Sequence, residues 1–226
     1  MEHRHLDDEL NKLSSNILKM GSLVEELIVT SVESLKSRSL NMAREVMEKD
    51  KFVDAIELEI NEHCLELLAL KQPMAADLRF VATAMLIATD LERMADLAVD
   101  IAQRVLELGQ EPLVKPLVDI PKMAIIAQKM LRNVLSAFIN RDIELAKQVY
   151  YDDDEEDNLR DEVYKELLLI MTKDGQTVPK AMPLLLISRH LERICDHATN
   201  IAEDIIYIVK GEMAKHHPEF FGRTFS

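Results

Sequence analysis

Carboxylate side chains recur at helical spacing in two parts of this 226-residue chain. In the first part, Glu92, Asp96 and Asp100 stand four residues apart, so in a helix their oxygen atoms lie along one stripe. The second part has the same spacing in Glu192, Asp196 and Asn200. Clustered carboxylates are hard oxygen ligands, suited to magnesium, manganese, calcium or iron. The two stripes therefore predict cation-binding faces, and shared carboxylates could bridge more than one ion.

A shorter acidic pair precedes each stripe. The pairs, again with four residues between the partners, are Asp50 with Asp54 and Asp153 with Asp157. If consecutive helices pack antiparallel, a pair and a stripe could face the same ion. A solvated helix face is the alternative, because 41 acidic residues produce chance pairs and Arg93 could form an ordinary ion pair with Asp96. We favour metal binding because the same arrangement occurs at matching places twice.

The remaining chemistry-bearing residues predict no catalytic centre. Oxygen-activating carboxylate bundles carry Glu-x-x-His on facing helices, and no histidine at position 63, 190 or 197 has Glu three residues earlier. No phosphate-binding glycine loop or Ser/His/Asp arrangement is present in the sequence. Cys64 and Cys195 fall in apolar helical patterns and are expected in the core. The terminal histidines 3, 5, 216 and 217 are expected to have only adventitious metal affinity, and the run 152–157 could be a solvated acidic turn.

Apolar residues recur every three or four positions along the chain, the period of one helix face. From Leu6 to Leu35 they predict a long first helix, and Ser39 can cap a second. Pro73 ends that helix or bends the chain. A third pattern runs from about Ala75 to Leu108, and Gly109 followed by two prolines supplies a stop signal and a linker.

The second half of the sequence repeats the first. A shift of 103 residues superposes the first two helical patterns on the next two, placing Asp54 on Asp157. A shift of 100 residues places Leu91–Asp96 on Leu191–Asp196. The two shifts differ by three residues, and a difference in loop length between the repeats accounts for this.

This repeat predicts an all-α fold of two tandem, pseudo-symmetric three-helix bundles with six long helices. The expected bundles are residues 1–112 and 113–226, and the acidic stripes should face outward. Asp119 is expected to cap the fourth helix, with Pro121 in its first turn.

Composition limits the partners and the compartment. A net charge of −14 argues against binding nucleic acid or adhering to anionic lipid, and favours cations and basic protein surfaces. Two isolated cysteines give no disulfide framework, which fits a reducing cytoplasm. The amino terminus has no signal-peptide pattern, and no run approaches the roughly 18 apolar residues of a membrane span. We expect a cytoplasmic protein that is not inserted in the membrane.

The sequence resembles the PhoU family, the cytoplasmic regulators associated with high-affinity phosphate transport. The resemblance is carried by QPMAADLR at 72–79, DLERMAD at 90–96 and RHLERICDHATNIAE at 189–203. It implies tandem three-helix bundles and single or multinuclear metal sites, with iron or zinc as the ions found in the family. By motif it assigns the metal role to Glu92, Asp96, Asp100, Glu192, Asp196 and Asn200.

The family pattern is not matched everywhere. Ile-Gly usually separates Glu-Arg from Asp, whereas this chain has Met94-Ala95 and Ile194-Cys195, and Asp100 stands where Asn is usual. The small residues at 95 and 195 preserve close packing, while the charge of the site and its choice of metal can differ.

The resemblance also implies a function. It predicts a negative regulator that links the cytoplasmic subunits of a phosphate ABC transporter to a sensor histidine kinase, so that phosphate-starvation genes stay off when phosphate is plentiful. We expect a homodimer. The alternatives are a carboxylate-bundle metal store, a metal-dependent enzyme or a scaffold without metal.

Overall fold

The computed structural model describes residues 2–211, with side chains from residue 6 onward. Its described part contains six α-helices and no β-strand, which confirms the all-α fold class. The helices are α1 (Glu2–Ser37), α2 (Leu40–Lys71), α3 (Ala76–Leu108), α4 (Asp119–Asn140), α5 (Ile143–Lys173) and α6 (Val178–Lys210). A short 3₁₀ turn, η1 (Gly175–Thr177), precedes α6.

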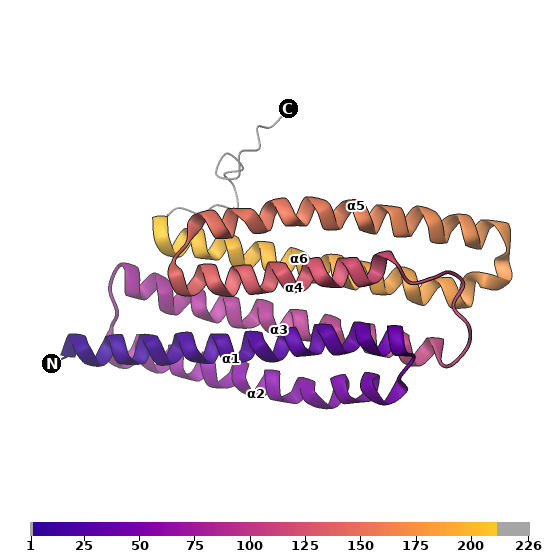
Figure 1. Ribbon diagram of the computed structural model, residues 1–226. Helices are drawn as coiled ribbons and strands as arrows, with labels where there is room; N and C mark the ends of the chain where they lie inside the picture. Colours follow the sequence, from indigo (N-terminus) through magenta and orange to yellow (C-terminus); the bar gives the residue numbers. More distant parts are fainter. Residues whose placement is uncertain (1, 212–226) are drawn as a thin grey trace.

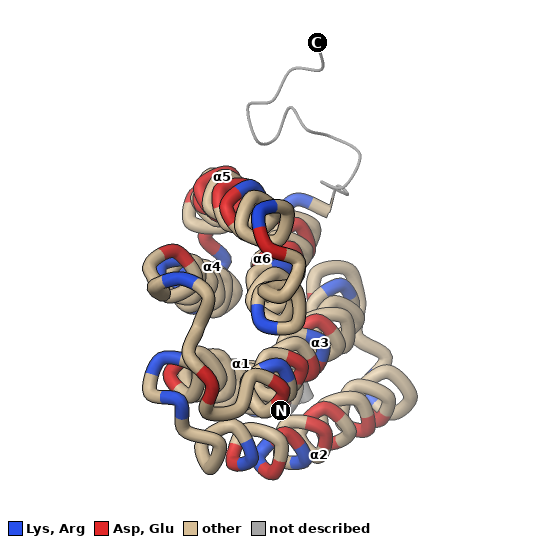
Figure 2. The backbone as a smooth tube through the Cα atoms, turned by 90° about the vertical axis from the view of Figure 1, so that its right-hand side faces the viewer, with Lys and Arg blue, Asp and Glu red and all other residues tan. Residues whose placement is uncertain are grey.

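The helices form two antiparallel three-helix bundles that lie against each other (Figure 1). Helices α1, α2 and α3 pack together, and so do α4, α5 and α6. The most extensive contact between helices joins α3 to α6, and a smaller one joins α1 to α4. Viewed along the helix axes, α3 and α6 therefore occupy the centre of the molecule (Figure 2). The predicted tandem, pseudo-symmetric bundles are confirmed.

Residues 109–118 connect the two bundles. The boundary predicted between residues 112 and 113 lies in this segment, and the last residues of the predicted second unit, 212–226, lie outside the described part. The Arg38 side chain in the α1–α2 turn donates hydrogen bonds to the carbonyl oxygens of Gly109, at 2.8 Å, and Glu111. The start of the connection is therefore held against the first bundle.

Equivalent turns begin the second helix of each bundle. Ser39 caps α2, as predicted, with its hydroxyl accepting from the Met42 amide at 3.4 Å. Asp142, 103 residues later, caps α5 by accepting from the Leu145 amide at 3.0 Å. The residues preceding these caps, Arg38 and Arg141, both have positive φ, of 58° and 52°. The repeat thus extends to backbone conformation.

The predicted cap at Asp119 is wrong. Asp119 is the first residue of α4, Val118 occupies the cap position, and no side-chain cap bond forms there. The Asp119 carboxylate instead pairs with the Lys122 ammonium at 3.0 Å and lies 3.7 Å from that of Lys115. The carboxylate is thus held in ion pairs with these lysines and makes no cap hydrogen bond. It still lies near the positive end of the helix dipole.

Helices α1 and α4 approach closely at a glycine. A Cβ atom added to Gly21 would lie 2.5 Å from Leu135 Cδ1 and 3.2 Å from its Cγ. A hydrogen atom at position 21 therefore permits this contact between the bundles. None of the described helices is both long and apolar enough to cross a bilayer.

Candidate metal centres

The first acidic cluster lies between α2 and α3, where Figure 2 shows acidic residues along both helices. We define it as Asp50, Asp54 and Glu57 of α2 with Glu92 and Asp96 of α3. The charges of Asp54 and Asp96 raise the pKa of Asp50, and the charge of Asp54 raises the pKa of both α3 carboxyls. The antiparallel packing therefore brings the predicted pair and stripe together.

Burial is the larger cause of the shifted pKa values in this cluster. It raises the pKa of Asp50 to about 6, assisted by the two neighbouring charges. Burial also raises the pKa of Glu92, whose side chain is 20% exposed, and of Asp96. Arg93 opposes both shifts, lying 3.4 Å from Glu92 and 3.6 Å from Asp96. The ion pair expected for a solvated helix face is present, but burial changes the pKa of both carboxyls more than the charge of Arg93 does.

The second acidic cluster lies between α5 and α6 and matches the first. We define it as Asp153, Glu156 and Asp157 of α5 with Glu192 and Asp196 of α6. Burial raises the pKa of Glu192, which is 23% exposed, and of Asp196, and the charge of Asp157 raises both further. Asp157 therefore raises the pKa of the α6 carboxyls as Asp54 raises the pKa of the α3 carboxyls.

Glu156 was not predicted as a site residue. Its side chain is 0% exposed, and burial raises its pKa to about 8, with further increases from Glu192, Asp157 and Asp153. The signal was available in the repeat, since a shift of 103 residues places Glu156 on the apolar Val53. Glu57 was also missed, although its charge contributes to the raised pKa of Glu92.

The run 152–157 is helical and partly buried, so the interpretation as a solvated turn is wrong. Asp152 is 5% exposed and pairs with the ammonium of Lys129 at 2.8 Å. The helical period turns Asp152 and Glu156 toward the packed side of α5.

The structure places the last members of the two stripes, Asp100 and Asn200, on α3 and α6. Asp100 raises the pKa of Asp96 through its charge, but one of its carboxylate oxygens also lies 3.8 Å from His190 Nδ1 on α6. Asn200 is half-buried. His197 Nδ1 lies 2.7 Å from Asp90 Oδ1, so this histidine joins α6 to α3.

The softer candidates occupy structural positions where they are described. His63 is half-buried and lies 2.9 Å from Glu9, while Cys64 and Cys195 are buried free thiols. Burial raises the pKa of Cys64 to about 12. The side chains of the terminal histidines, 3, 5, 216 and 217, lie outside the described part.

The donor chemistry of both clusters fits a hard cation. The buried Asp50 Oδ1 and both carboxylate oxygens of Glu156 have no hydrogen-bond partner. Among the residues described, no three His, Cys, Asp or Glu side chains already converge so that they could hold one ion. Binding would require side-chain rotations that bring oxygens to about 2.0–2.6 Å from a cation. A bound cation would then neutralise the repulsion among the carboxylates.

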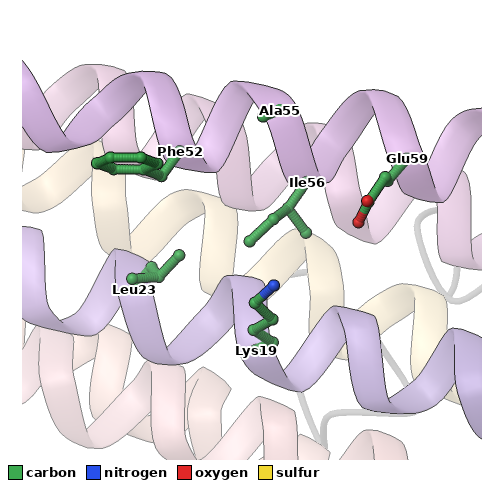
Figure 3. Close-up of a pocket in the computed structure, with 6 residues that line it drawn as sticks. All are labelled: Lys19, Leu23, Phe52, Ala55, Ile56 and Glu59. Atoms are coloured by element: carbon green, nitrogen blue, oxygen red, sulfur yellow. The ribbon is translucent and has the colours of Figure 1, made fainter.

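A different kind of surface lies between α1 and α2. This shallow, mostly apolar groove is shown in Figure 3, where Lys19 and Leu23 of α1 lie opposite residues of α2. The α2 residues that line it are Phe52, Ala55, Ile56 and Glu59. It offers packing surface rather than a set of metal ligands, and the acidic clusters lie in other helix pairs.

Comparison with known proteins identifies both halves of the chain. The sequence model described as the PhoU domain matches residues 17–105 and again residues 120–205. The phosphate-specific transport system accessory protein PhoU homolog of Aquifex aeolicus is 39% identical over 208 residues, covering 92% of this chain and 94% of that protein. The Escherichia coli accessory protein PhoU is 32% identical, covering 92% of this chain and 86% of that protein.

Solved structures agree with these sequence matches. The crystal structure of PhoU from Pseudomonas aeruginosa superposes with a TM-score of 0.87 at 34% identity, covering 91% of this chain and 99% of that one. The crystal structure of the phosphate transport system regulatory protein PhoU from Streptococcus pneumoniae gives a TM-score of 0.86 at 32% identity, covering 92% and 98%.

Proposed function

The chain belongs to the PhoU family of phosphate-transport accessory proteins, and from this premise we propose that it is a cytoplasmic negative regulator of phosphate uptake. In this role it links the cytoplasmic subunits of a phosphate ABC transporter to a sensor histidine kinase. The observation that carries the proposal is the match to named accessory proteins over more than nine-tenths of this chain. The proposed role is regulatory rather than catalytic.

The charge of the molecule supports an adaptor role. At −14 the chain is suited to basic patches on partner proteins, and its attraction to them should weaken as salt increases. The same charge disfavours nucleic acid. A homodimer remains a prediction, which sedimentation of the purified protein can decide.

Gene deletion tests the regulatory role. In phosphate-rich medium, deletion should switch on phosphate-scavenging genes, because the repressing link between transporter and kinase is lost. A plasmid copy of the parent gene should restore repression. If those genes stay silent and neither transporter nor kinase co-purifies with the protein, the regulatory proposal is wrong, and a metal store becomes the better interpretation.

We also propose that both acidic clusters bind divalent or ferric cations, which hold α2 against α3 and α5 against α6. The raised pKa values of the facing carboxyls and the unpartnered buried oxygens support this structural clamp. A clamp needs only neutralised repulsion, whereas a metal that bridges to phosphate or to a partner also needs open coordination positions. Iron and zinc are candidates, as are magnesium, manganese and calcium.

Removal of the acidic side chains tests the clamp. A variant with Glu92→Ala, Asp96→Ala, Glu192→Ala and Asp196→Ala should lose bound cation on elemental analysis after chelation and reloading. Its helicity should be kept, since these side chains lie at the edges of helix contacts. In cells it should restore repression only partly. Equal metal content in variant and parent would refute the clamp without touching the regulatory proposal.

A further inference from the structure

The two acidic clusters differ at two repeat positions: Arg160 stands where the first cluster has Glu57, and Glu156 stands at a core position where the first bundle has Val53. Glu156 and its repeat equivalent Val53 are both 0% exposed, so an apolar core position of the first bundle holds a carboxyl group in the second. Neither carboxyl oxygen of Glu156 has a hydrogen-bond partner. A buried polar group without a partner destabilises the fold, whereas valine at the same position would not.

Basic side chains compensate the buried carboxyl group of Glu156 only weakly. The basic side chain that acts on Glu156 is Arg160, whose guanidinium donates to Asp157 at 3.0 Å and lies 3.9 Å from Glu192. Its charge has the smallest effect among those that act on Glu156. Arg160 is therefore engaged by the other members of the cluster.

Glu156 is the most buried member of the second acidic cluster. The carboxylates of Glu192, Asp157 and Asp153 all lie close enough for their charges to act on it, and Glu156 in turn acts on the neighbouring thiol of Cys195. Another anion near Glu156 would add to the repulsion, and the apolar side chains of the core cannot donate hydrogen bonds to its oxygens. A cation placed among these carboxylates is the ligand that would satisfy the buried oxygens and offset the repulsion together.

We propose that Glu156 is an additional cation ligand, absent from the first acidic cluster, and that the second cluster consequently binds a hard cation more tightly than the first. This inference rests on the cation binding proposed above. Its physical basis is the buried carboxyl group of Glu156, because only in the second cluster would a cation satisfy a carboxyl group that has no hydrogen-bond partner on either oxygen. The two repeats then have unequal sites, despite their matching helices.

Proteins with a single intact cluster test the inequality. The first cluster is removed by Asp54→Asn, Glu92→Gln and Asp96→Asn, and the second is removed in a separate protein by Asp157→Asn, Glu192→Gln and Asp196→Asn. Circular dichroism establishes that both are folded, and each is titrated with MnCl₂ in a calorimeter. The protein that retains the second cluster should bind Mn²⁺ about 10-fold or more tightly than the other. Adding Glu156→Val should remove that advantage.

A second measurement separates a ligand from a structural defect. In the full chain with EDTA, Glu156→Val should raise the melting temperature, because an unsatisfied buried carboxyl group is replaced by the residue found in the first repeat. With Mn²⁺ the same variant should gain less stability than the parent does. The exposed neighbour supplies a control, and Glu155→Gln should change neither quantity.

The outcomes distinguish this inference from the proposal beneath it. If Mn²⁺ binds the parent and the Glu156→Val variant equally, Glu156 is not a ligand and only this inference falls. If the parent binds no Mn²⁺ at either cluster, both this inference and the proposed metal clamp are wrong. The regulatory proposal is tested independently by gene deletion.

Discussion

Carboxyl groups placed between two packed helices lose water and gain like-charged neighbours, and both effects favour the protonated form. Asp50, Glu92, Glu192 and Asp196 all have raised pKa values for these two reasons. Glu156 is the extreme case, because its burial is complete. The metal-free protein therefore contains groups whose ionisation opposes folding.

The pH dependence of stability follows from these groups. Glu156 has a folded-state pKa of about 8 against an ordinary value of 4.5, so the folded chain keeps a proton that the unfolded chain releases between these values. Its stabilising contribution is complete below pH 4.5 and is lost as pH rises through about 8. In EDTA, the melting temperature should fall by roughly 5 °C between pH 5 and 8.

Glu156→Gln is the control for this pH dependence. It keeps the size of the side chain and removes the titrating group, so its melting temperature should vary less over the same pH interval. A parent protein whose stability rises from pH 5 to 8 would contradict the prediction.

Two pairs of helices join the bundles, and the contacts in the two pairs are of different kinds. Helices α1 and α4 meet where Gly21 receives the Leu135 side chain, a contact that depends on the absence of a Cβ atom. Helices α3 and α6 are joined by packing and by His197 with Asp90 at 2.7 Å. His190 lies 3.8 Å from Asp100 in the same helix pair.

The α1–α4 contact predicts a steric defect. Gly21→Val should lower the free energy of unfolding by about 2 kcal/mol, because the new side chain would overlap Leu135 in a packed contact. Urea unfolding measures the change. In a Leu135→Ala background the same substitution should alter stability by less than about 0.5 kcal/mol, since the overlapping atoms are gone.

A matched glycine provides the control for this substitution. Gly175 lies in η1 and would meet nothing within 4 Å on gaining a Cβ atom, so Gly175→Ala should have little effect. Equal penalties for Gly21→Val with and without Leu135 would show that the overlap is not the cause.

The whole molecule is built around α3 and α6, one from each bundle. Each packs within its own bundle and against the other, so neither bundle retains its full core when separated (Figure 1). The apolar residues of both repeats form one continuous core cluster. Folding of one bundle therefore creates part of the surface on which the other packs.

This shared interface predicts cooperative unfolding. Scanning calorimetry in EDTA should show one transition with equal calorimetric and van't Hoff enthalpies, because loss of either bundle exposes the α3–α6 contact. Asp90→Ala should lower the temperature of that single transition. Two resolved transitions in the parent would show that the bundles unfold independently.

Features that depend on neighbouring residues can be predicted from the sequence alone. The period of apolar residues predicted the helices, and Ser39, Pro73 and Gly109 predicted their limits, because caps and turns act within a few residues. The repeat predicted two bundles and placed equivalent acidic pairs and stripes on consecutive helices. The structure contains these helices and bundles because the packed faces are the ones that the apolar period predicts.

The contacts between carboxyls and the central position of α3 and α6 depend on residues that are far apart in the chain. The repeat aligns Glu156 with a core position, but the charge of Glu192 that acts on it comes from α6, whose residues lie far along the chain. Asp119 likewise formed ion pairs instead of the predicted cap. Burial and charge pairing depend on distances in space, and these exist only once the helices have packed.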